Sequence, residues 1–522
     1  MAAVSRRAFI AGGVAVGVGL AVGIPFAVGA SGATSTGQQL VSRARLPRPF
    51  TQRLVVPPTL TPVLTGDVDR YEIVARTARA RILPGLTTTI FGYNGIFPGP
   101  LIRSRSNHPI EVVYRNRLPV PIVTHLHGGH TPHDSDGYPT DYVYPEDMTY
   151  LRQHQEMSHE TPMPAGDTTN GTRTYRYPLR QRAAMLWYHD HRMDFTGPSV
   201  WFGLAGAHIV NDDEEDALGL PDGAREIPLV LTDRAFNDDG SLLYPAVDRT
   251  LTTTPGVTGG FVAGVLGDVM LVNGVPWPVA DVERASYRIR MLNACNARRL
   301  RLRLDPPPTD GIVQIGTEGG LLDAPLTYDA FELAPAQRLD AVVDFSRFAP
   351  GTEVTLYNDF GDGGMKNVMR FRVNSTSGPR YTVPSALSSV ERLDPASATV
   401  TRRFRFQRGT VDHRSGWIIG NSPFSPSEVS ASPRLGDVEI WELFADFHHP
   451  VHIHLDPFQV ISRGINGPGA FDAGWKDTID LVPGEQARIA VRFRDHVGRF
   501  VFHCHNLEHE DMAMMANFVT HA

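Results

Sequence analysis

The hydrophobic pattern of the chain is that of many short β-strands. Segments rich in β-branched and aromatic residues occur at 110–114 (IEVVY), 288–292 (RIRML), 438–443 (VEIWEL) and 499–502 (RFVF). Long amphipathic helical windows are absent from the sequence, and the only helical candidate is a short one at 213–218. With 49 glycines and 41 prolines punctuating the segments, the pattern predicts an all-β protein made of sandwich or barrel domains.

An internal repeat suggests that these domains are related. The sequence YNGIFP at 93–98 returns as VNGVP at 272–276 and, loosely, as GNSP at 420–423. Each copy precedes a β-rich segment, so we interpret the copies as equivalent turns of a repeated unit. At 522 residues, the chain has the length of about three domains.

Two stretches of turn-forming composition separate the domains. One is acidic and contains proline and glycine (211–225), and the other is rich in serine, proline and threonine (375–402). We therefore predict domains at 45–212, 225–375 and 400–522.

Composition limits the function classes. A hydrophobic content of 42% with 20% charged residues is typical of a soluble globular protein. The net charge of −7 gives no indication of nucleic acid or an anionic membrane as partner. We therefore expect no nucleic-acid partner and no stable membrane insertion.

The N-terminus has the features of an export signal. Arg6 and Arg7 precede an uncharged stretch rich in glycine, alanine and valine that extends to about Ala30. A membrane anchor is the alternative, because the stretch is nearly long enough to span a bilayer, but its glycines make a poor permanent helix. We predict a twin-arginine signal at 1–30, cleaved near Ala30, and a location that is extracellular, periplasmic or in the cell envelope.

The C-terminal segment carries the most specific chemistry. His503, Cys504 and His505 are consecutive, and His509 and Met514 follow. Successive side chains of a strand point to opposite faces, so Cys504 faces away from its two histidine neighbours. A cysteine thiolate, a histidine and a weak axial methionine are the donors of a blue-copper site. The flanking histidines would then hold different metal on the other side of the strand.

Three further histidine pairs have the same one-residue spacing, which places two imidazoles on one strand face. The pairs are His125 with His127, His189 with His191, and His452 with His454, the last preceded by His449. No histidine lies between His208 and His413. The middle domain therefore cannot supply an imidazole, and a metal cluster should lie between the first and third domains.

The chain has only two cysteines, Cys295 and Cys504. A disulfide would be the ordinary expectation in an exported protein. The histidines around Cys504 have metal-ligand spacing, so we reject the disulfide. Cys295 is interpreted as a small buried apolar residue.

With these motifs the chain resembles the multicopper oxidases, particularly the three-domain bacterial laccases, spore-coat laccase and bilirubin oxidase. The matching stretches are 124–138 (THLHGGHTPHDSDGY), 187–197 (WYHDHRMDFTG), 449–455 (HPVHIHL) and 503–515 (HCHNLEHEDMAMM). The resemblance implies three cupredoxin-like Greek-key β-sandwich or barrel domains. It also implies four copper ions, namely one type 1, one type 2 and two type 3.

The ligand set follows from the resemblance, residue by residue. It implies type 1 copper at His449, Cys504, His509 and Met514, type 2 copper at His125 and His452, and type 3 copper at His127, His189, His191, His454, His503 and His505. The family spacing selects His449 over His448, which we expect to face solvent, and Met514 over Met512 and Met515.

Two histidines interrupt the first motif. His130 and His133 could bind extra copper, but a solvated loop is the preferred interpretation.

Two carboxylates match family acids near the oxygen-reducing cluster. Asp136 and Glu510 would relay the protons that oxygen reduction consumes. The alternatives are an Asx-turn before Gly137 for Asp136 and a solvent-facing carboxylate at a strand end for Glu510.

The resemblance implies a laccase-like enzyme that couples one-electron oxidation of phenols or aromatic amines to the four-electron reduction of dioxygen to water. Its partners would be dioxygen and a small aromatic or metal-ion reductant, and we expect a monomer. Alternatives are bilirubin oxidation and a Cu(I) or Mn(II) metallo-oxidase serving copper tolerance. A copper-free structural protein with this fold is disfavoured because every ligand is present.

Overall fold

The computed structural model describes residues 34–148, 150, 166–411 and 414–522. The export signal predicted at 1–30 lies outside the described residues. All four predicted strand segments fall within strands, and the short helical candidate is also confirmed. These elements are β5 (Ile110–Arg117), β17 (Ser286–Asn293), β27 (Val438–Ala445), β32 (Gly498–Cys504) and α3 (Asp213–Ala217).

The first domain is a pair of four-stranded sheets, ordered β3-β2-β5-β9 and β4-β11-β10-β6. Buried aromatic and aliphatic side chains such as Tyr93, Tyr114 and Leu186 fill the space between the sheets. The strands are β2 (Asp69–Ala80), β3 (Thr88–Tyr93), β4 (Ile102–Arg105), β6 (Thr124–His127), β9 (Thr172–Tyr177), β10 (Ala184–Asp190) and β11 (Ala205–Asn211).

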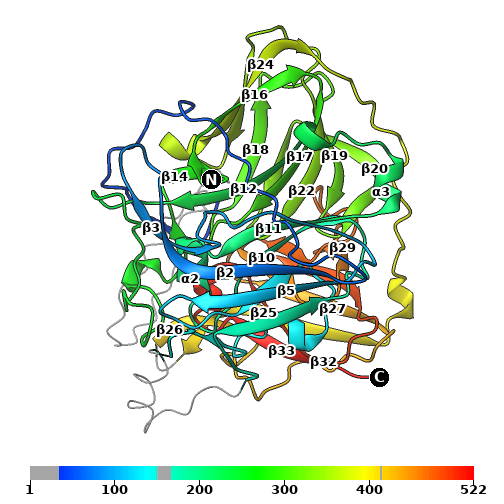
Figure 1. Ribbon diagram of the computed structural model, residues 1–522. Helices are drawn as coiled ribbons and strands as arrows, with labels where there is room; N and C mark the ends of the chain where they lie inside the picture. The colour runs from blue at the N-terminus through cyan, green and yellow to red at the C-terminus, as the bar shows by residue number, and fades with distance from the viewer. Residues whose placement is uncertain (1–33, 149, 151–165, 412–413) are drawn as a thin grey trace, which may run out of the picture. The chain divides into compact units, whose positions relative to one another are not determined.

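The middle domain has a seven-stranded sheet, β15-β14-β12-β17-β22-β19-β20, and a five-stranded sheet, β16-β24-β23-β18-β21. Its strands lie above those of the other two domains in Figure 1. They are β12 (Glu226–Arg234), β14 (Val269–Val272), β15 (Val275–Pro276), β16 (Val279–Arg284), β18 (Leu300–Asp305), β19 (Ile312–Thr317), β20 (Gly320–Tyr328), β21 (Ala330–Leu333), β22 (Arg338–Asp344), β23 (Glu353–Asn358) and β24 (Asn367–Ser377).

The third domain has a five-stranded sheet, β26-β25-β27-β31-β29, and a four-stranded sheet, β30-β28-β32-β33. The core between them includes Trp441, Phe502 and Phe518. The strands are β25 (Val400–Val411), β26 (Arg414–Ile419), β28 (His449–Ile453), β29 (Phe458–Arg463), β30 (Thr478–Leu481), β31 (Gln486–Arg492) and β33 (Met515–Thr520).

One strand arrangement occurs in all three domains. The first long strand (β2, β12 or β25) pairs antiparallel with a later strand (β3, β14 or β26) on one side. On its other side it pairs parallel with β5, β17 or β27. That strand then pairs antiparallel with β9, β22 or β31. All three domains therefore share one mixed topology. In each of them the parallel pair requires a crossover connection.

The repeated Asn-Gly sequence makes the same turn twice. Asn94 and Asn273 have φ values of 54° and 51°, and the glycines that follow them have 70° and 79°. Asparagine and glycine tolerate this left-handed conformation best. Each asparagine side chain also accepts a 2.8 Å hydrogen bond from the backbone N–H of the first long strand, at Val74 or Val230. In the third copy only Gly420, with φ 71°, keeps the left-handed turn.

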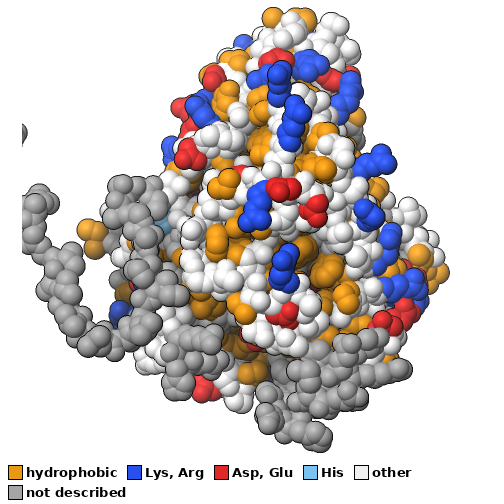
Figure 2. Space-filling view, turned by 90° about the vertical axis from the view of Figure 1, so that its left-hand side faces the viewer, with side chains coloured by type: hydrophobic (Ala, Val, Ile, Leu, Met, Phe, Trp, Pro, Cys, Tyr) orange, Lys and Arg blue, Asp and Glu red, His pale blue; other side chains and the backbone are white. Residues whose placement is uncertain are grey.

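Residues 34–522 form one compact unit, so the boundaries at 212, 225, 375 and 400 remain predictions. Among the described residues, no helix combines the length and apolar character needed to cross a membrane. On the face shown in Figure 2, basic and acidic side chains are interspersed among apolar ones.

Candidate metal centres

Strand register brings the histidine pairs together. In the first domain, β6 pairs with β10 so that His125 lies opposite His189. In the third domain, β28 pairs with β32 so that His452 lies opposite His503 and Val451 lies opposite Cys504. The same strand therefore presents histidine to one side and cysteine to the other, as alternation along a strand requires.

Eight imidazoles from the two domains form one buried cluster, each at most 1% exposed. Their ring nitrogens converge in three groups within which they lie no more than 4.8 Å apart. The groups are His127 with His189 and His505; His191 with His454 and His503; and His125 with His452 and His454.

One nitrogen of most of these rings is held by a neighbouring oxygen. His125 Nδ1 lies 2.6 Å from the Asp136 carbonyl, His452 Nδ1 lies 2.8 Å from the Asp477 carbonyl, and His189 Nδ1 lies 2.9 Å from the Asp190 carbonyl. These contacts fix the tautomer and the orientation of each ring, as the outer partners of metal-ligating histidines do.

The opposite nitrogens are buried and have no hydrogen-bond partner among the described residues. They are Nε2 of His125, His189 and His452, Nδ1 of His127, and both ring nitrogens of His505. Leaving so many buried polar atoms unsatisfied is costly, whereas a metal ion would satisfy them together. The donor set is imidazole, which suits copper, zinc, iron and nickel.

Protonation also favours metal binding. Burial lowers the pKa of His189 to about 3 and the pKa of His191 to about 4. It lowers the pKa of His125, His127, His452, His454 and His505 well below the ordinary value as well. The rings are therefore neutral at physiological pH, which is the form that binds a metal.

A second group lies on the other side of β32. Cys504 Sγ is 3.4 Å from His449 Nδ1 and 3.6 Å from His509 Nδ1, and the two nitrogens are 3.1 Å apart. His509 lies in the short helix α4 (Leu507–Glu510). Burial raises the pKa of the Cys504 thiol well above its ordinary value, so a thiolate here needs a nearby cation. Two imidazoles and one thiolate are the equatorial donors of a blue-copper site.

Met514 is fully buried in the same apolar core as Cys504. Its carbonyl accepts a 3.1 Å hydrogen bond from the backbone N–H of Cys504. The outer nitrogens of the two histidines also have partners: His449 Nε2 lies 2.9 Å from Asp446 Oδ1, and His509 Nε2 lies 3.1 Å from the Ala263 carbonyl.

Both predicted carboxylates border one imidazole group. Asp136 Oδ2 lies 2.7 Å from His454 Nδ1. Glu510 lies 3.1 Å from His503 Nδ1 and 3.6 Å from His191 Nδ1, and it accepts a 2.7 Å hydrogen bond from the Thr196 hydroxyl. Both side chains are 2% exposed, so the alternative of a solvent-facing Glu510 is wrong.

The two carboxyl groups have opposite pKa shifts. Burial raises the pKa of Asp136 to about 8. Burial also raises the pKa of Glu510, but the His503 and His191 imidazoles outweigh it and lower that pKa to about 2. The raised pKa favours the protonated form of Asp136, and the lowered pKa favours the ionised form of Glu510.

The chain is similar in sequence and fold to laccases and other multicopper oxidases. Multicopper oxidase family models match residues 75–215 and 394–522. A laccase of Bacillus subtilis is 33% identical over 89% of this chain and 97% of its own length. The chain belongs to the multicopper oxidase family. Its members are copper oxidoreductases that use dioxygen and a reducing substrate.

Two further similar proteins agree with this membership. A bilirubin oxidase of Albifimbria verrucaria is 32% identical over 90% of this chain and 81% of its own length. The crystal structure of a multicopper oxidase from Pediococcus acidilactici superposes with a TM-score of 0.78, 30% identity and 93% coverage of both chains. The three domains are cupredoxin-like.

Two expectations about histidines are wrong. His448 was expected to face solvent, but it is only 9% exposed, and its Nδ1 lies 3.4 Å from the Thr36 hydroxyl oxygen. His130 was expected in a solvated loop, but it is 1% exposed and lies between Asp456, at 3.1 Å, and Asp495, at 2.6 Å. His133 is exposed.

Several residues around the multicopper oxidase site were missed in the sequence. Trp417 stacks on the His509 ring with the centroids 3.8 Å apart, and nothing in its strand signals this contact. Asp446 precedes His449 by three residues, and that spacing was available as a signal. The other two missed residues are Asp477 and Arg338. Asp477 follows Lys476, one of only two lysines in the chain, and Arg338 lies in the middle domain.

A glycine beside Asp136 gives a stability prediction. Gly137 has φ +78°, and a Cβ there would lie 2.3 Å from the Thr124 carbonyl oxygen, next to His125. We expect Gly137→Ala to lower the free energy of unfolding by about 2–4 kcal/mol, the sum of left-handed strain and overpacking. Gly85 has φ +77° and no atom within 4 Å of such a Cβ, so Gly85→Ala should cost only the strain, roughly 1–2 kcal/mol. Equal denaturation midpoints for the two variants would contradict the steric explanation.

Proposed function

We propose that the protein is a laccase-like multicopper oxidase that couples one-electron oxidation of phenols or aromatic amines to reduction of dioxygen to water. The observation that carries the proposal is the arrangement around β32. A thiolate site with two imidazoles lies on one side, and a cluster of eight imidazoles lies on the other.

The groups of converging nitrogens support the ligand assignment. Type 1 copper would be held by His449, Cys504 and His509, with Met514 as the axial ligand. His125 and His452, whose Nε2 atoms are both unpartnered, would hold type 2 copper. The groups His127–His189–His505 and His191–His454–His503 would each hold one type 3 copper, giving four ions in all.

Bound copper would supply one-electron oxidation of the donor at the thiolate site and multi-electron reduction of dioxygen at the imidazole cluster. The chain supplies the connection between the two sites. Cys504 is joined by the peptide backbone to His503 on one side and to His505 on the other. These two histidines belong to different type 3 groups. Burial of all three side chains excludes water from the connection.

The carboxylates would move the protons that oxygen reduction consumes. Asp136, whose raised pKa of about 8 favours the protonated form, lies against His454. Glu510, whose lowered pKa favours the ionised form, lies beside His191 and His503, so it would pass a proton on and not retain it. Paired groups with opposite shifts are the arrangement that acid–base chemistry requires.

The reducing substrate is proposed from the relatives. The laccase and bilirubin oxidase relatives favour aromatic donors, and bilirubin is the second candidate. A metallo-oxidase for Cu(I) or Mn(II) is less favoured, because such proteins often carry methionine-rich segments and the 13 methionines of this chain are spread thinly.

Oxygen uptake with a panel of donors tests the proposal. Copper-loaded protein should consume oxygen with phenols or aromatic amines at a donor-to-oxygen ratio of four, without releasing peroxide. Faster uptake with bilirubin, Cu(I) or Mn(II) would instead select one of the other substrates. Uptake with none of these donors would refute the oxidase function.

Export through the twin-arginine route, as a monomer, completes the proposal. Its support is the Arg6-Arg7 pair before an uncharged stretch. Replacing both arginines by lysine should retain the protein inside the cell, as fractionation would show.

A further inference from the structure

The middle domain supplies no histidine, yet one of its arginines reaches the imidazole cluster. Arg338, the first residue of β22, is 2% exposed. Its Nη1 and Nη2 atoms donate to the two carboxylate oxygens of Asp477 across 2.8 and 2.5 Å. Paired, charge-assisted hydrogen bonds of this kind are both strong and directional.

Asp477 in turn contacts histidines of two different groups. Its Oδ1 lies 3.2 Å from His127 Nε2, and its backbone carbonyl lies 2.8 Å from His452 Nδ1. The remaining nitrogens of these rings, Nδ1 of His127 and Nε2 of His452, are the unpartnered ones that face the proposed metals. Asp477 therefore sets which nitrogen of each ring is free.

The guanidinium is fitted to the segments that carry the histidines. Its Nε donates to the Met185 carbonyl in β10, the strand that holds His189, across 2.9 Å. A Cβ on Gly128, the residue after His127, would lie 2.5 Å from Arg338 Nη2 and 2.8 Å from Asp477 Oδ2. The absence of a side chain at Gly128 thus makes room for the Arg338–Asp477 pair.

We infer that Arg338 is a positioning residue for the imidazole cluster and acts through Asp477 on His127 and His452. The inference rests on the proposed copper function. Without Arg338, the buried Asp477 carboxylate would lose its charge partner, which is strongly destabilising for a buried ion. Asp477 would then move away from the imidazoles that it orients.

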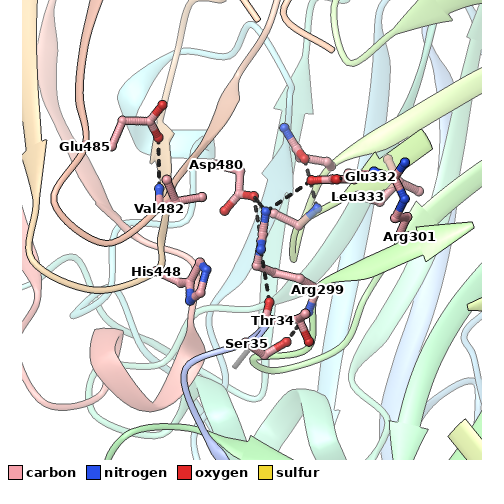
Figure 3. A network of polar contacts seen from close by, with 12 residues as sticks. Thr34, Ser35, Arg299, Arg301, Glu332, Leu333, His448, Asp480, Val482 and Glu485 are labelled. Atoms are coloured by element: carbon pink, nitrogen blue, oxygen red, sulfur yellow. Dashed lines mark hydrogen bonds and ion pairs between the residues drawn. The ribbon is translucent and has the colours of Figure 1, made fainter. Parts of the chain in front are cut away.

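A neighbouring contact of the same kind supplies the matched control. Arg299, also from the middle domain, pairs with Asp480 of β30 across 2.6 Å. Figure 3 shows Arg299 between Asp480, Glu332 and the backbone of Thr34, and His448 appears in the same view. Arg299 thus joins the same two domains, and its partner Asp480 lies three residues after Asp477. Among the described residues, the hydrogen bonds of Arg299 go to Asp480, Thr34 and Glu332 and not to the eight imidazoles of the cluster.

The test compares Arg338→Met with Arg299→Met in full-length, copper-loaded protein. Copper affinity of the imidazole cluster, measured by chelator competition, should fall about 10–100-fold in R338M, and the type 2 paramagnetic resonance signal should change. The visible band of the thiolate site should remain. R299M should lower the melting temperature but keep wild-type copper affinity at the imidazole cluster.

Two further variants separate positioning from simple domain adhesion. Asp477→Asn added to R338M removes the unpaired charge and keeps an acceptor for His127 Nε2, so it should restore part of the copper affinity. Arg338→Lys keeps the charge without the paired geometry, and it should lie between wild type and R338M. It also provides a folded variant if R338M fails to fold.

Equal copper affinity in wild type, R338K and R338M would overturn the inference, as would equal losses in R338M and R299M. Wild-type protein that bound no copper would overturn the proposed function itself. If wild type and R338M both bound their full complement of copper, only the role of Arg338 would be overturned.

Discussion

Cys504→Ser is expected to abolish the intense visible band of the protein and to reduce donor-dependent oxygen uptake to background. A hydroxyl is a harder and weaker donor than a thiolate, so it cannot form the copper–thiolate bond of a blue site. It also removes the sulfur that joins the thiolate site to His503 and His505. The band and the uptake are measured on the same copper-loaded sample.

Cys295→Ser is the matched control, because Cys295 is the only other cysteine and is equally buried. Cys295 Sγ lies 3.9 Å from the Leu231 carbonyl in the middle domain and takes part in none of the converging groups. The C295S variant should keep both the band and the uptake. A visible band that survives in C504S, or that disappears in C295S, would place the thiolate site elsewhere.

Glu510→Gln is expected to lower kcat about 100- to 1,000-fold with the visible band unchanged. A positioned acid or base contributes roughly that much to a proton-coupled step, and glutamine cannot carry a proton from Oε2 to the cluster. The thiolate site should be unaffected because Glu510 contacts His191, His503 and Thr196 rather than Cys504. Steady-state oxygen uptake and the absorption spectrum measure the two effects.

The neighbouring Glu508 is a buried carboxylate without that role. It accepts hydrogen bonds from Asn296, Tyr244 and the Val265 N–H, and burial raises its pKa to about 7. Glu508→Gln should therefore keep kcat near the wild-type value. Similar losses of kcat in E508Q and E510Q would mean that the effect comes from disturbing α4 and not from proton transfer.

The sequence was sufficient for the local features of the fold and the site. Strand segments such as 110–114 and 499–502 were predicted because alternation and β-branched residues are local properties. The opposed directions of Cys504 and His503 followed from the same alternation. The Asn-Gly repeat marked equivalent turns, because a left-handed backbone restricts which residues fit.

Contacts between distant segments could not be predicted in this way. Arg338 and Asp477 are 139 positions apart, and no local pattern indicates that a middle-domain arginine reaches the cluster. His448 and His130 were expected to be solvated because histidine in a loop is usually exposed, but Thr36 covers one of them and Asp456 and Asp495 enclose the other. Burial of this kind depends on how domains pack.

Anomalous X-ray scattering at the copper absorption edge, from crystals of copper-loaded protein, is the most direct test of the metal arrangement. One peak is expected between His449, Cys504 and His509, and three are expected among the eight clustered imidazoles. No peak beside the sulfur, or an imidazole cluster without copper, would contradict the paired sites.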